Sequence, residues 1–438
     1  MSSDEKTTSF QSSVLAELSW RGLIKQVTHD ELDEKLSGED LTLYCGFDPS
    51  ADSLHAGNLV SIMGLAHFRR HGHHPIALVG GATGMIGDPS GKSNERDLLD
   101  DEILQKNLAG ISKQLRTILD RSTEMHAEGL DASEREIPIV NNADWIRPWS
   151  FIDFLRDVGK HFKVNHMINK TSVKERLENR DQGISYTEFS YMLIQGYDFF
   201  HLFKEHGCTL QIGGSDQWGN ITAGTDLIRS KERTSAFGAT FNLLTDKNGK
   251  KYGKSEAGAI WLDAERTSPY QFFQYWLGVD DEEVGKLLRT FTFLSQEKIE
   301  ELEADPYNGK KVFAYEITAL VHGKDAADKV VRASKVLFGG EMDQLTDADL
   351  KDAFAEVPTT EVSRQRLEEG IEVLDLFVEV GLEKSKGAAR RKLEQGGLYL
   401  NNNRIEDREQ VIGLQDLATE TAIFLRSGKR NKHLLRMV

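Results

Sequence analysis

The sequence predicts an α/β protein built on a parallel sheet, and three observations support this prediction. Short apolar runs that suit strands alternate with helical patterns over residues 40–265. Glycine-rich turns follow several of these runs, and open α/β sheets bind ligands beyond the carboxyl ends of their strands. From residue 268 to about 355 the strand patterns stop and charged amphipathic helices take over. We therefore expect a Rossmann-like parallel-sheet domain over 1–265, followed by an α-helical domain over 266–355.

Five runs in the first domain suit buried strands, because each is short, apolar and bounded by turn-forming residues. They are LTLYCGF at 41–47, PIALVGG at 75–81, IPIVNN at 137–142, CTLQIGG at 208–214 and ATFNLL at 239–244. In the second domain, DEEVGKLLRTF at 281–291 and SQEKIEELEAD at 295–305 have the spacing of amphipathic helices.

The chain after residue 355 divides into two parts. Residues 356–370 are polar and poorly periodic, which is typical of a linker. Residues 371–438 then predict a small α+β domain, with a helix in SKGAARRKLEQGG (385–397) and a hairpin-like strand in LYLNNNRI (398–405).

Length and composition exclude several classes of protein. A chain of 438 residues is too long for one ordinary core, and 39% hydrophobic with 28% charged residues is typical of a globular protein. No apolar run approaches the ~20 residues that span a bilayer, and the N-terminus has neither signal nor transit character. Two cysteines, Cys45 and Cys208, form no disulfide framework and no metal-ligand spacing. We therefore expect a cytoplasmic protein with no membrane segment and no protein-bound metal.

The formal net charge of −16 hides a strong asymmetry along the chain. Residues 384–438 contain twelve Lys and Arg against six Asp and Glu, so this segment carries +6 and the remainder −22. A basic module on an acidic body favours a polyanionic partner at that end of the chain. A solvated basic surface with no partner is the alternative.

Two polar side chains lie at the start of an apolar helix after the first strand. Asp48 and Pro49 end the strand, and His55 and Asn58 come directly before the helical run. The free N–H groups of a helix start attract anions, so hydrogen-bonding side chains at this position suit a phosphate site. Capping of the helix is the alternative.

A glycine-rich turn with two cations follows the second strand, in GGATGMIGDPSGKSNER at 80–96. Ile86 stands where a P-loop requires glycine, so the stretch is not a Walker motif. Lys92 and Arg96 suit a loop that closes over an anion, and a plain connection is the alternative.

A second loop with two cations is GKKYGKSEAG, at 249–258. Lys251 and Lys254 lie among small residues, which suits a loop that moves onto a charged ligand. Lysine-rich hairpin turns are common, so this pattern is weak when it is taken alone.

A buried helix carries three polar residues on one face. In TEFSYMLIQGYDFFHLF (187–203), Tyr191, Gln195 and Asp198 fall at i, i+4 and i+7 among apolar residues. A helix that is apolar nearly all round is buried, and a buried carboxylate needs a partner. These residues therefore favour the lining of a small polar pocket, with a structural role as the alternative.

Asp216 and Gln217 follow another strand, in QIGGSDQWGN at 211–220. The glycines before them allow a ligand to approach the backbone closely, and a carboxylate there can accept ribose hydroxyls. A helix N-cap is the alternative, since Ser215 and Asp216 open a helical pattern.

In combination, these motifs resemble the bacterial-type tyrosyl-tRNA synthetases, which are class I aminoacyl-tRNA synthetases. The resemblance runs from about Leu15 to the end and is carried by YCGFDP, GGATGMIGDPSG, EFSYMLIQGYD and QIGGSDQWGNI. HAGN takes the place of the family's His-Ile-Gly-His signature, with Asn58 for the second histidine. KYGKS takes the place of Lys-Met-Ser-Lys-Ser, with Tyr252 and Gly253 for Met and Ser. Neither departure removes a charge that the reaction needs.

The resemblance implies that the 1–265 domain activates L-tyrosine with ATP to tyrosyl-adenylate, releases pyrophosphate and transfers tyrosine to the acceptor end of tRNA(Tyr). It also implies Mg²⁺ as the companion of ATP and a homodimer. The 266–355 helices would be the anticodon-side domain, and 371–438 would be an S4-like RNA-binding domain that binds tRNA through backbone phosphates and shape.

The family's functional residues carry over to matching positions in four groups. The catalytic group would be His55, Ser50, Asn58, Lys92, Arg96, Lys251 and Lys254. The tyrosine-binding group would be Tyr44, Asp88, Tyr191, Gln195, Asp198 and Gln217. The ATP-binding group would be Cys45, Gly46, Asp48, His55, Asn58, Gly214, Asp216 and Lys254. The tRNA-binding group would be Lys384, Lys386, Arg390, Arg391, Arg426, Lys429 and Arg430.

Three other functions stay open at this point. A tryptophanyl-tRNA synthetase shares the fold and both signatures, but does not need Tyr44 with Asp198 or the S4-like tail. A small-molecule adenylyltransferase also uses a histidine at a helix start, but does not need a basic RNA module. A non-catalytic RNA-binding protein derived from a synthetase should have lost some charged site residues, and all of them are present here.

Overall fold

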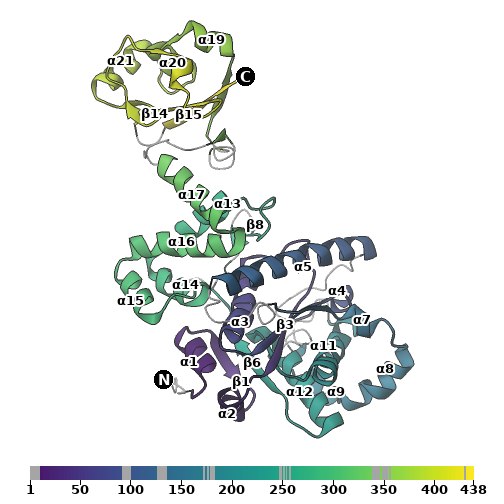
Figure 1. Ribbon diagram of the computed structural model, residues 1–438. Coiled ribbons are helices and arrows are strands. Elements are labelled where there is room, and N and C mark those ends of the chain that lie inside the picture. Colours follow the sequence, from purple (N-terminus) through teal and green to yellow (C-terminus); the bar gives the residue numbers. More distant parts are fainter. Residues whose placement is uncertain are drawn as a thin grey trace. The chain divides into compact units, whose positions relative to one another are not determined.

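Figure 1 shows the computed structural model of the chain. The structure describes residues 10–90, 100–125, 136–170, 173–174, 177, 183–245, 249, 252, 254–255, 258–337, 346–347, 354, 357–428 and 431–438. The chain divides into two compact units, of which the first contains 1–267 and 278–313 and the second contains 268–277 and 314–438. No helix among the described residues is long and apolar enough to cross a bilayer.

The first unit is built on a six-stranded sheet in the order β1-β6-β5-β2-β3-β4. The strands are β1 (Ile24–Val27), β2 (Thr42–Phe47), β3 (His74–Val79), β4 (Ile139–Asn141), β5 (Cys208–Gly214) and β6 (Phe237–Phe241). β2 to β6 run parallel, and β1 joins the edge antiparallel to β6. The five predicted strands and the parallel sheet are therefore present. β1 was missed because its four residues, IKQV, are too few and too polar to stand out.

Helices cover both faces of this sheet (Figure 1). Their bounds are α1 (Ser13–Trp20), α2 (Glu31–Gly38), α3 (Leu59–Arg70), α4 (Thr83–Ile86), α5 (Asp101–Glu124), α7 (Ala143–Ile146), α8 (Phe151–Asp157), α9 (Val164–Ile168), α11 (Tyr186–His206) and α12 (Trp218–Glu232). α3 and α5 pack together, as do α11 and α12. Alternation along β2 sends the Tyr44 ring to within 5.4 Å of Phe199 on α11, whereas the Cys45 thiol meets Ser61 on α3.

The helices that were predicted as one domain over 266–355 are divided between the two units. The first unit includes η4 (Asp281–Glu283), α14 (Val284–Phe291) and α15 (Gln296–Ala304). A buried cation directly after α1 explains this assignment, because the Arg21 guanidinium donates to the main-chain carbonyls of Arg289, Thr292 and Leu294 at 2.8–3.0 Å. The carbonyls at a helix C-terminus lack partners inside the helix, so Arg21 ties the end of α14 to the sheet domain.

The second unit combines helices of that segment with a five-stranded sheet in the order β12-β11-β14-β15-β9. Its helices are α13 (Pro269–Leu277), the last part of α16 (Pro306–His322), α17 (Lys324–Leu337), α19 (Arg364–Glu369), α20 (Val373–Glu379) and α21 (Lys386–Glu394). The sheet strands are β9 (Thr359–Val362), β11 (Leu398–Leu400), β12 (Asn403–Arg404), β14 (Ala422–Ser427) and β15 (Asn431–Met437). Ile423 and Leu425 of β14 join the core under α20 and α21, whereas Phe424 joins Val336 and Leu337 of α17.

The predicted linker over 356–370 is wrong. β9 and α19 lie in this range, and β9 pairs in parallel with β15, with Thr359 opposite Leu434 and Val362 opposite Met437. The range looks like a linker because β9 is a short edge strand whose partner lies about seventy residues further along the chain. The predicted helix and hairpin of the C-terminal domain are present as α21 and as the β11–β12 pair.

Candidate active site

The sheet of the first unit has a crevice where its strand order reverses. The chain places β3 and β4 on one side of β2, then returns to place β5 and β6 on the other side. Loops that leave β2 and β5 therefore run in opposite directions, and open α/β sheets bind ligands at such a point. A cavity of about 390 Å³ lies there, lined by residues of β2, β5 and α11 and of the segments that follow the two strands.

This cavity brings together most of the predicted site residues of the first unit. They are Tyr44, Cys45, Gly46, Asp48, Ser50, His55, Asn58, Asp88, Tyr191, Gln195, Asp198, Gly214, Asp216 and Gln217. The predicted cations Lys92, Arg96 and Lys251 lie outside the described residues. Of Lys254 only the backbone is described, in β7 (Lys254–Ser255).

α11 supplies the polar face that was predicted on the 187–203 helix. The helix begins after Ser185, whose hydroxyl accepts the N–H of Glu188, and ends at Gly207, which adopts the left-handed conformation with φ of 62°. Its apolar residues pack into two core clusters, so Tyr191 and Asp198 are buried where they line the cavity.

Asp198 is almost fully buried, and its carboxylate accepts two hydrogen bonds. Nδ2 of Asn142 donates to Oδ2 at 2.9 Å, and Nε1 of Trp145 donates to Oδ1 at 2.8 Å. Burial raises the pKa of Asp198 to about 7, although these two hydrogen bonds favour the ionised form. Because each carboxylate oxygen can accept a further hydrogen bond, Asp198 can still receive a donor from a ligand.

The hydroxyl of Tyr44 is buried and has no hydrogen-bond partner among the residues that the structure describes. Burial, and then the charge of Asp198, raise the pKa of Tyr44 well above its usual value, so the hydroxyl keeps its proton. Oε1 of Gln195 and Oε1 of Gln211 are also buried without a partner within the described part of the chain. A buried polar group without a partner costs about 1–3 kcal/mol, so these three groups point to a polar ligand.

A second carboxylate shares the hydrogen-bond network of Asp198. Oγ1 of Thr83 donates to Oδ1 of Asp48 at 2.7 Å, and the Tyr191 hydroxyl donates to Oδ2 at 2.8 Å. Nδ2 of Asn142 also lies 3.1 Å from Oγ1 of Thr83, which connects the two carboxylates. Gly80 permits this arrangement, because a Cβ atom there would lie 2.2 Å from the Asp48 carboxylate.

A third carboxylate organises the other side of the lining. Nε2 of Gln217 donates to Oδ2 of Asp88 at 2.6 Å, and the N–H of Ser90 donates to Oδ1 at 2.9 Å. Nε2 of Gln195 donates to Oε1 of Gln217 at 3.3 Å, and Asn220 donates to the same oxygen at 3.2 Å. Three carboxylates with neutral donors between them can bind a cationic group and a hydroxyl in one cavity.

His55 and Asn58 cap the turn that precedes α3, and their remaining donors can bind an anion. Nδ1 of His55 accepts the N–H of Gly57 at 3.1 Å, and Oδ1 of Asn58 accepts the N–H of His55 at 3.0 Å. Since Nδ1 is an acceptor, the proton of the neutral imidazole lies on Nε2, which is therefore a donor. Asn58 uses its oxygen in the cap and has an NH₂ group as donor, so both side chains can donate to phosphate oxygens.

The segment after the second lysine loop is hydrogen-bonded to the segment that carries His55. The N–H of Ala56 donates to the carbonyl of Ile260, and the N–H of Leu262 donates to the carbonyl of Leu54, both at 2.9 Å. The rings of His55 and Trp261 lie 6.4 Å apart. The segment directly after the second signature therefore pairs with the segment that carries the first, although the two are about two hundred residues apart in the sequence.

Sequence reasoning missed several polar residues of the site. Asn142 and Trp145 hold Asp198, Thr83 holds Asp48, and Gln211 lines the cavity. A signal existed for Asn142 and Gln211, since Asn142 ends one predicted strand and Gln211 lies within another. Trp145 carried no such signal, because its role depends on a contact with a residue 53 positions away.

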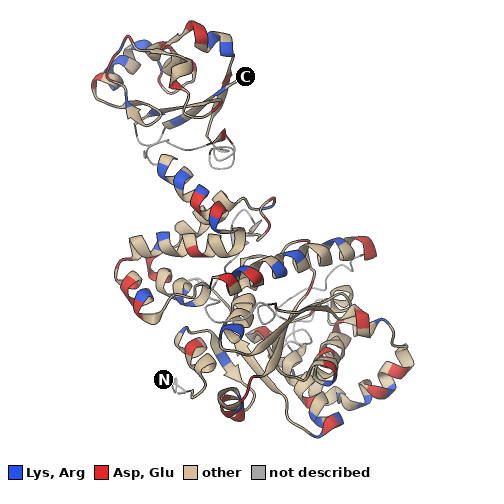
Figure 2. Ribbon diagram, in the orientation of Figure 1, with Lys and Arg blue, Asp and Glu red and all other residues tan. Residues whose placement is uncertain are grey.

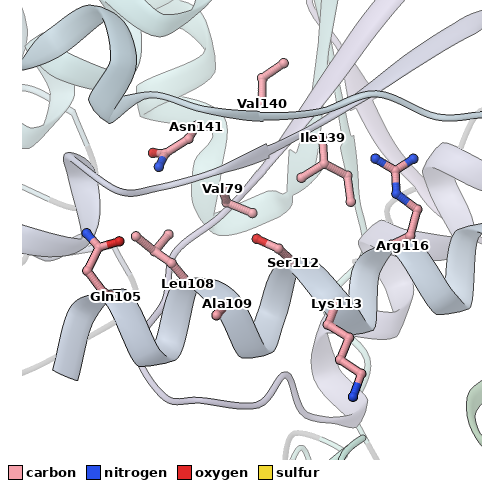
Figure 3. A pocket seen from close by; sticks show the side chains of 10 residues that line it. All are labelled: Val79, Gln105, Leu108, Ala109, Ser112, Lys113, Arg116, Ile139, Val140 and Asn141. Atoms are coloured by element: carbon pink, nitrogen blue, oxygen red, sulfur yellow. The ribbon is translucent and has the colours of Figure 1, made fainter. Parts of the chain in front are cut away.

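A second, more open cavity of about 510 Å³ lies between α5 and β4 (Figure 3). It is lined by Val79, Gln105, Leu108, Ala109, Ser112, Lys113, Arg116, Ile139, Val140 and Asn141. Its Arg116 donates to the Glu136 carboxylate at 2.9 Å and to the Ile137 carbonyl at 3.0 Å. None of the predicted site residues lines this cavity, and no unpartnered buried polar atom of the described chain lies in its lining.

The predicted tRNA-binding cations differ in exposure. Lys384, Lys386, Arg390 and Arg391 are exposed, and the last three lie on α21 (Figure 2). Arg426 is half-buried, since its guanidinium stacks at 3.7 Å on the Tyr399 ring and donates to Asn402 and to the Gly428 carbonyl. The remaining two, Lys429 and Arg430, lie outside the described residues.

Comparison with protein families identifies the class to which this fold and cavity belong. The model of the class I tRNA synthetases (W and Y) matches residues 36–339, and the model of the tyrosine-tRNA ligase SYY-like C-terminal domain matches residues 349–435. The chain therefore belongs to the class I tRNA synthetases of the W and Y family.

Within that family, its relatives are tyrosine-tRNA ligases. The chain is 48% identical to the tyrosine-tRNA ligase of Roseiflexus castenholzii, over 97% of this chain and 99% of the relative, and 46% identical to that of Opitutus terrae, over 97% and 100%. The crystal structure of a C-terminally truncated Aspergillus nidulans mitochondrial tyrosyl-tRNA synthetase matches with a TM-score of 0.68 and 31% identity. That match covers 76% of this chain and 96% of the other.

Proposed function

We propose that this chain is a tyrosine-tRNA ligase. It activates L-tyrosine with ATP to tyrosyl-adenylate, releases pyrophosphate, and transfers the tyrosyl group to the acceptor end of tRNA(Tyr). The observation that carries the proposal is that the buried carboxylate of Asp198 lines the same cavity as the Tyr44 hydroxyl, which has no partner in the described part of the chain. The full-length similarity to tyrosine-tRNA ligases supports it independently.

The phenol of the substrate satisfies both groups. Its O–H donates to Asp198, and its oxygen accepts from the Tyr44 hydroxyl. An indole N–H only donates, so tryptophan would leave the Tyr44 hydroxyl without a partner. Phenylalanine would also leave it without a partner, and would give Asp198 no donor from the ligand. This asymmetry disfavours the tryptophanyl-tRNA synthetase alternative, and the cavity with its complete set of polar groups disfavours a non-catalytic RNA-binding protein.

The rest of the tyrosine-binding group holds the α-amino end. Asp88, the Tyr191 hydroxyl oxygen and Oε1 of Gln195 can accept hydrogen bonds from an ammonium group, and Gln217 orients Asp88. The unpartnered Oε1 of Gln195 supports this role.

The reaction needs positioning and charge stabilisation, because the tyrosine carboxylate is already ionised and needs no general base. One carboxylate oxygen forms a bond to the α-phosphorus of ATP, and the bond to the bridging oxygen breaks with its electron pair leaving on pyrophosphate. His55, Asn58 and Ser50 donate to the phosphate oxygens whose charge grows as phosphorus becomes five-coordinate. Contacts made only then raise the rate and not the ground-state affinity.

Nucleotide and pyrophosphate binding involve the remaining residues of the first unit. The ribose and its surroundings are contacted by Cys45, Gly46, Asp48, Gly214 and Asp216. The cations that close over pyrophosphate are Lys92, Arg96, Lys251 and Lys254. Mg²⁺ would enter as the companion of ATP and would neutralise charge on its phosphates.

The C-terminal domain binds tRNA(Tyr) through its cations. The contacts are Lys384, Lys386, Arg390, Arg391, Arg426, Lys429 and Arg430. The exposed positions on α21 suit contact with a polyanion, whereas the partners of Arg426 suit a role in shaping the surface.

The active form is a homodimer in the cytoplasm. α8, α9 and the start of α11 expose a set of large apolar side chains, which a second copy would cover. The set consists of Phe151, Ile152, Val164, Ile168 and Tyr186, each at least 41% exposed.

Amino-acid-dependent ATP–pyrophosphate exchange, run in parallel with tyrosine, tryptophan and phenylalanine, tests the proposal. Exchange with tyrosine alone is expected. Exchange with tryptophan would contradict the assignment of Tyr44 and Asp198, and absence of exchange with all three, from folded protein, would overturn the enzymatic function.

A further inference from the structure

We infer that Glu283 is a positioning residue for tyrosine activation, which acts by holding the hydroxyl of Tyr252 so that the backbone of Tyr252 stays against the His55–Asn58 turn. The inference rests on the proposed function and adds a residue to it. Glu283 is absent from the lining of the cavity, and among the described residues it has no hydrogen bond to one that is assigned to a substrate, so its effect passes through Tyr252.

Tyr252 contacts Glu283 through its side chain and two residues of the cavity lining, Leu244 and Gly57, through its backbone. Its hydroxyl donates to Oε2 of Glu283 at 3.0 Å, and its N–H donates to the carbonyl of Leu244 at 3.0 Å. Its own carbonyl oxygen would lie 3.7 Å from a Cβ atom placed on Gly57, which is an ordinary van der Waals distance. Tyr252 also lines the cavity itself, so a residue of the second signature packs against the first.

Glu283 is a buried carboxylate whose partners are few. It is 8% exposed and lies at the end of η4, directly before α14. Apart from the Tyr252 hydroxyl, the Nζ atom of Lys286 lies 3.8 Å from Oε2, and Lys286 also donates to the Thr245 carbonyl. A buried carboxylate is costly unless it is hydrogen-bonded, so the bond from Tyr252 is one that this site needs.

The element that carries Glu283 is rigid. The apolar side of α14 is buried, with Leu287 and Leu288 fully inside. At its C-terminal end the Arg21 guanidinium binds three main-chain carbonyls, and the ring of Phe293 lies 5.0 Å from that of the buried His67. A carboxylate on such an element can hold the Tyr252 hydroxyl at a fixed place relative to the sheet.

The hydroxyl of Tyr252 supplies a donor within the second lysine loop, and Glu283 is its acceptor. Lys251 is the neighbour of Tyr252 in the chain and Lys254 is two residues further on, and both are assigned to pyrophosphate. Fixing Tyr252 restricts the conformations from which these lysines approach the leaving group, which lowers the entropic barrier of the chemical step.

The test combines three variants in the full-length protein: Tyr252→Phe, Glu283→Ala and the double variant. Each single change is expected to lower kcat for tyrosine-dependent ATP–pyrophosphate exchange about tenfold and to leave KM for tyrosine within twofold, because the lost bond is to a charged acceptor. The double variant should be no slower than the slower single variant, since both changes remove the same hydrogen bond. Glu283→Gln keeps an acceptor oxygen and should stay within threefold of the unmodified protein.

A matched control is available in the second unit. The Tyr315 hydroxyl donates to the Asp328 carboxylate at 2.9 Å, and neither residue lines the cavity. Tyr315→Phe should leave kcat unchanged. This result would show that the loss of a tyrosine–carboxylate hydrogen bond lowers kcat at Glu283 and not wherever such a bond is removed.

Three outcomes would overturn the inference: an unchanged kcat in Tyr252→Phe, multiplicative effects in the double variant, or a lowered melting temperature as the only change. The unmodified protein is measured in the same assay. If it showed no ATP–pyrophosphate exchange, the proposed function would be contradicted, whereas a failure confined to the variants concerns only the role of Glu283.

Discussion

Charged side chains are buried and connected in the cavity of the first unit, but exposed and separate on α21 of the second. Asp198 accepts two hydrogen bonds at 2.8 and 2.9 Å, and through Asn142 and Thr83 it belongs to the same network as Asp48. Arg390 and Arg391 are exposed on a helix that carries four basic residues, and exposed Lys386 pairs with Asp375 at 2.5 Å.

The difference teaches how each region recognises its ligand. In the cavity a group acts through geometry, because burial makes an unpaired polar atom costly and a network holds each atom in place. On α21 the side chains act through the sum of their charges, which solvent and salt screen. Single substitutions should therefore have large effects in the cavity and small, additive ones on α21.

The largest effect is expected from Asp198→Ala. It removes the acceptor for the substrate phenol and leaves the donors of Asn142 and Trp145 unpaired, so kcat/KM for tyrosine-dependent exchange should fall about 10³-fold. Glu39→Ala, which removes an exposed carboxylate paired with Lys35, is the control and should stay within twofold. Comparable losses in the two variants would break the contrast between buried and exposed charges.

The same contrast between buried and exposed charged side chains applies to cations that stabilise the fold. Arg21→Ala leaves three main-chain carbonyls at the end of α14 without their donor and removes one of the cationic partners of Glu17, so the free energy of unfolding should fall by about 3–5 kcal/mol. Arg364→Ala breaks an exposed pair with Glu368 and should cost less than about 1 kcal/mol. Urea unfolding measures both, and similar midpoints would contradict the burial argument.

The pH dependence of tyrosine binding sharpens the account of Asp198, whose pKa of about 7 is raised by burial. The ionised carboxylate accepts a hydrogen bond from the phenol O–H, so the dissociation constant for tyrosine should rise by up to about tenfold between pH 8 and pH 6. Calorimetric titration measures it, and Asp198→Asn should bind more weakly without this dependence. A tyrosine affinity that is flat with pH in the unmodified protein would refute the assignment.

The raised pKa of Asp198 also affects the free energy of unfolding. The contribution of this carboxyl to stability is complete below pH ~4 and is lost as the pH rises to about 7.

The smallest effect is expected from single changes on α21. Arg390→Gln should weaken tRNA binding about threefold to fivefold at low salt and reduce the slope of log affinity against log salt by about one, because one phosphate contact is lost. Exchange with tyrosine should be unchanged in the same preparation. Filter binding at several salt concentrations checks the slope, and a hundredfold loss at every salt concentration would show that Arg390 acts by geometry instead.

Much of the first unit could be predicted from the sequence, because its strands are apolar runs bounded by turn residues. A local pattern also predicted that Tyr191, Gln195 and Asp198 line a polar pocket, because they are three polar residues on one face of an apolar helix. The cavity at the β2–β5 junction then contains all three.

The rest depends on contacts between distant residues, which leave no local pattern. β9 resembles a linker until it pairs with β15, and α14 resembles part of a separate domain until Arg21 binds its end. Trp145 and Thr83 are ordinary residues in the sequence and become site residues only through their bonds to Asp198 and Asp48.

The contrast between the two regions can be measured on the unmodified protein by following KM for tyrosine and KM for tRNA(Tyr) from 50 to 200 mM salt. If four exposed cations each contact a phosphate, KM for tRNA should rise about a hundredfold over this range. KM for tyrosine should change less than twofold, because the groups that bind it are buried and screened little. A rise of KM for tyrosine in parallel with that for tRNA would contradict the account, since both regions would then act through exposed charge.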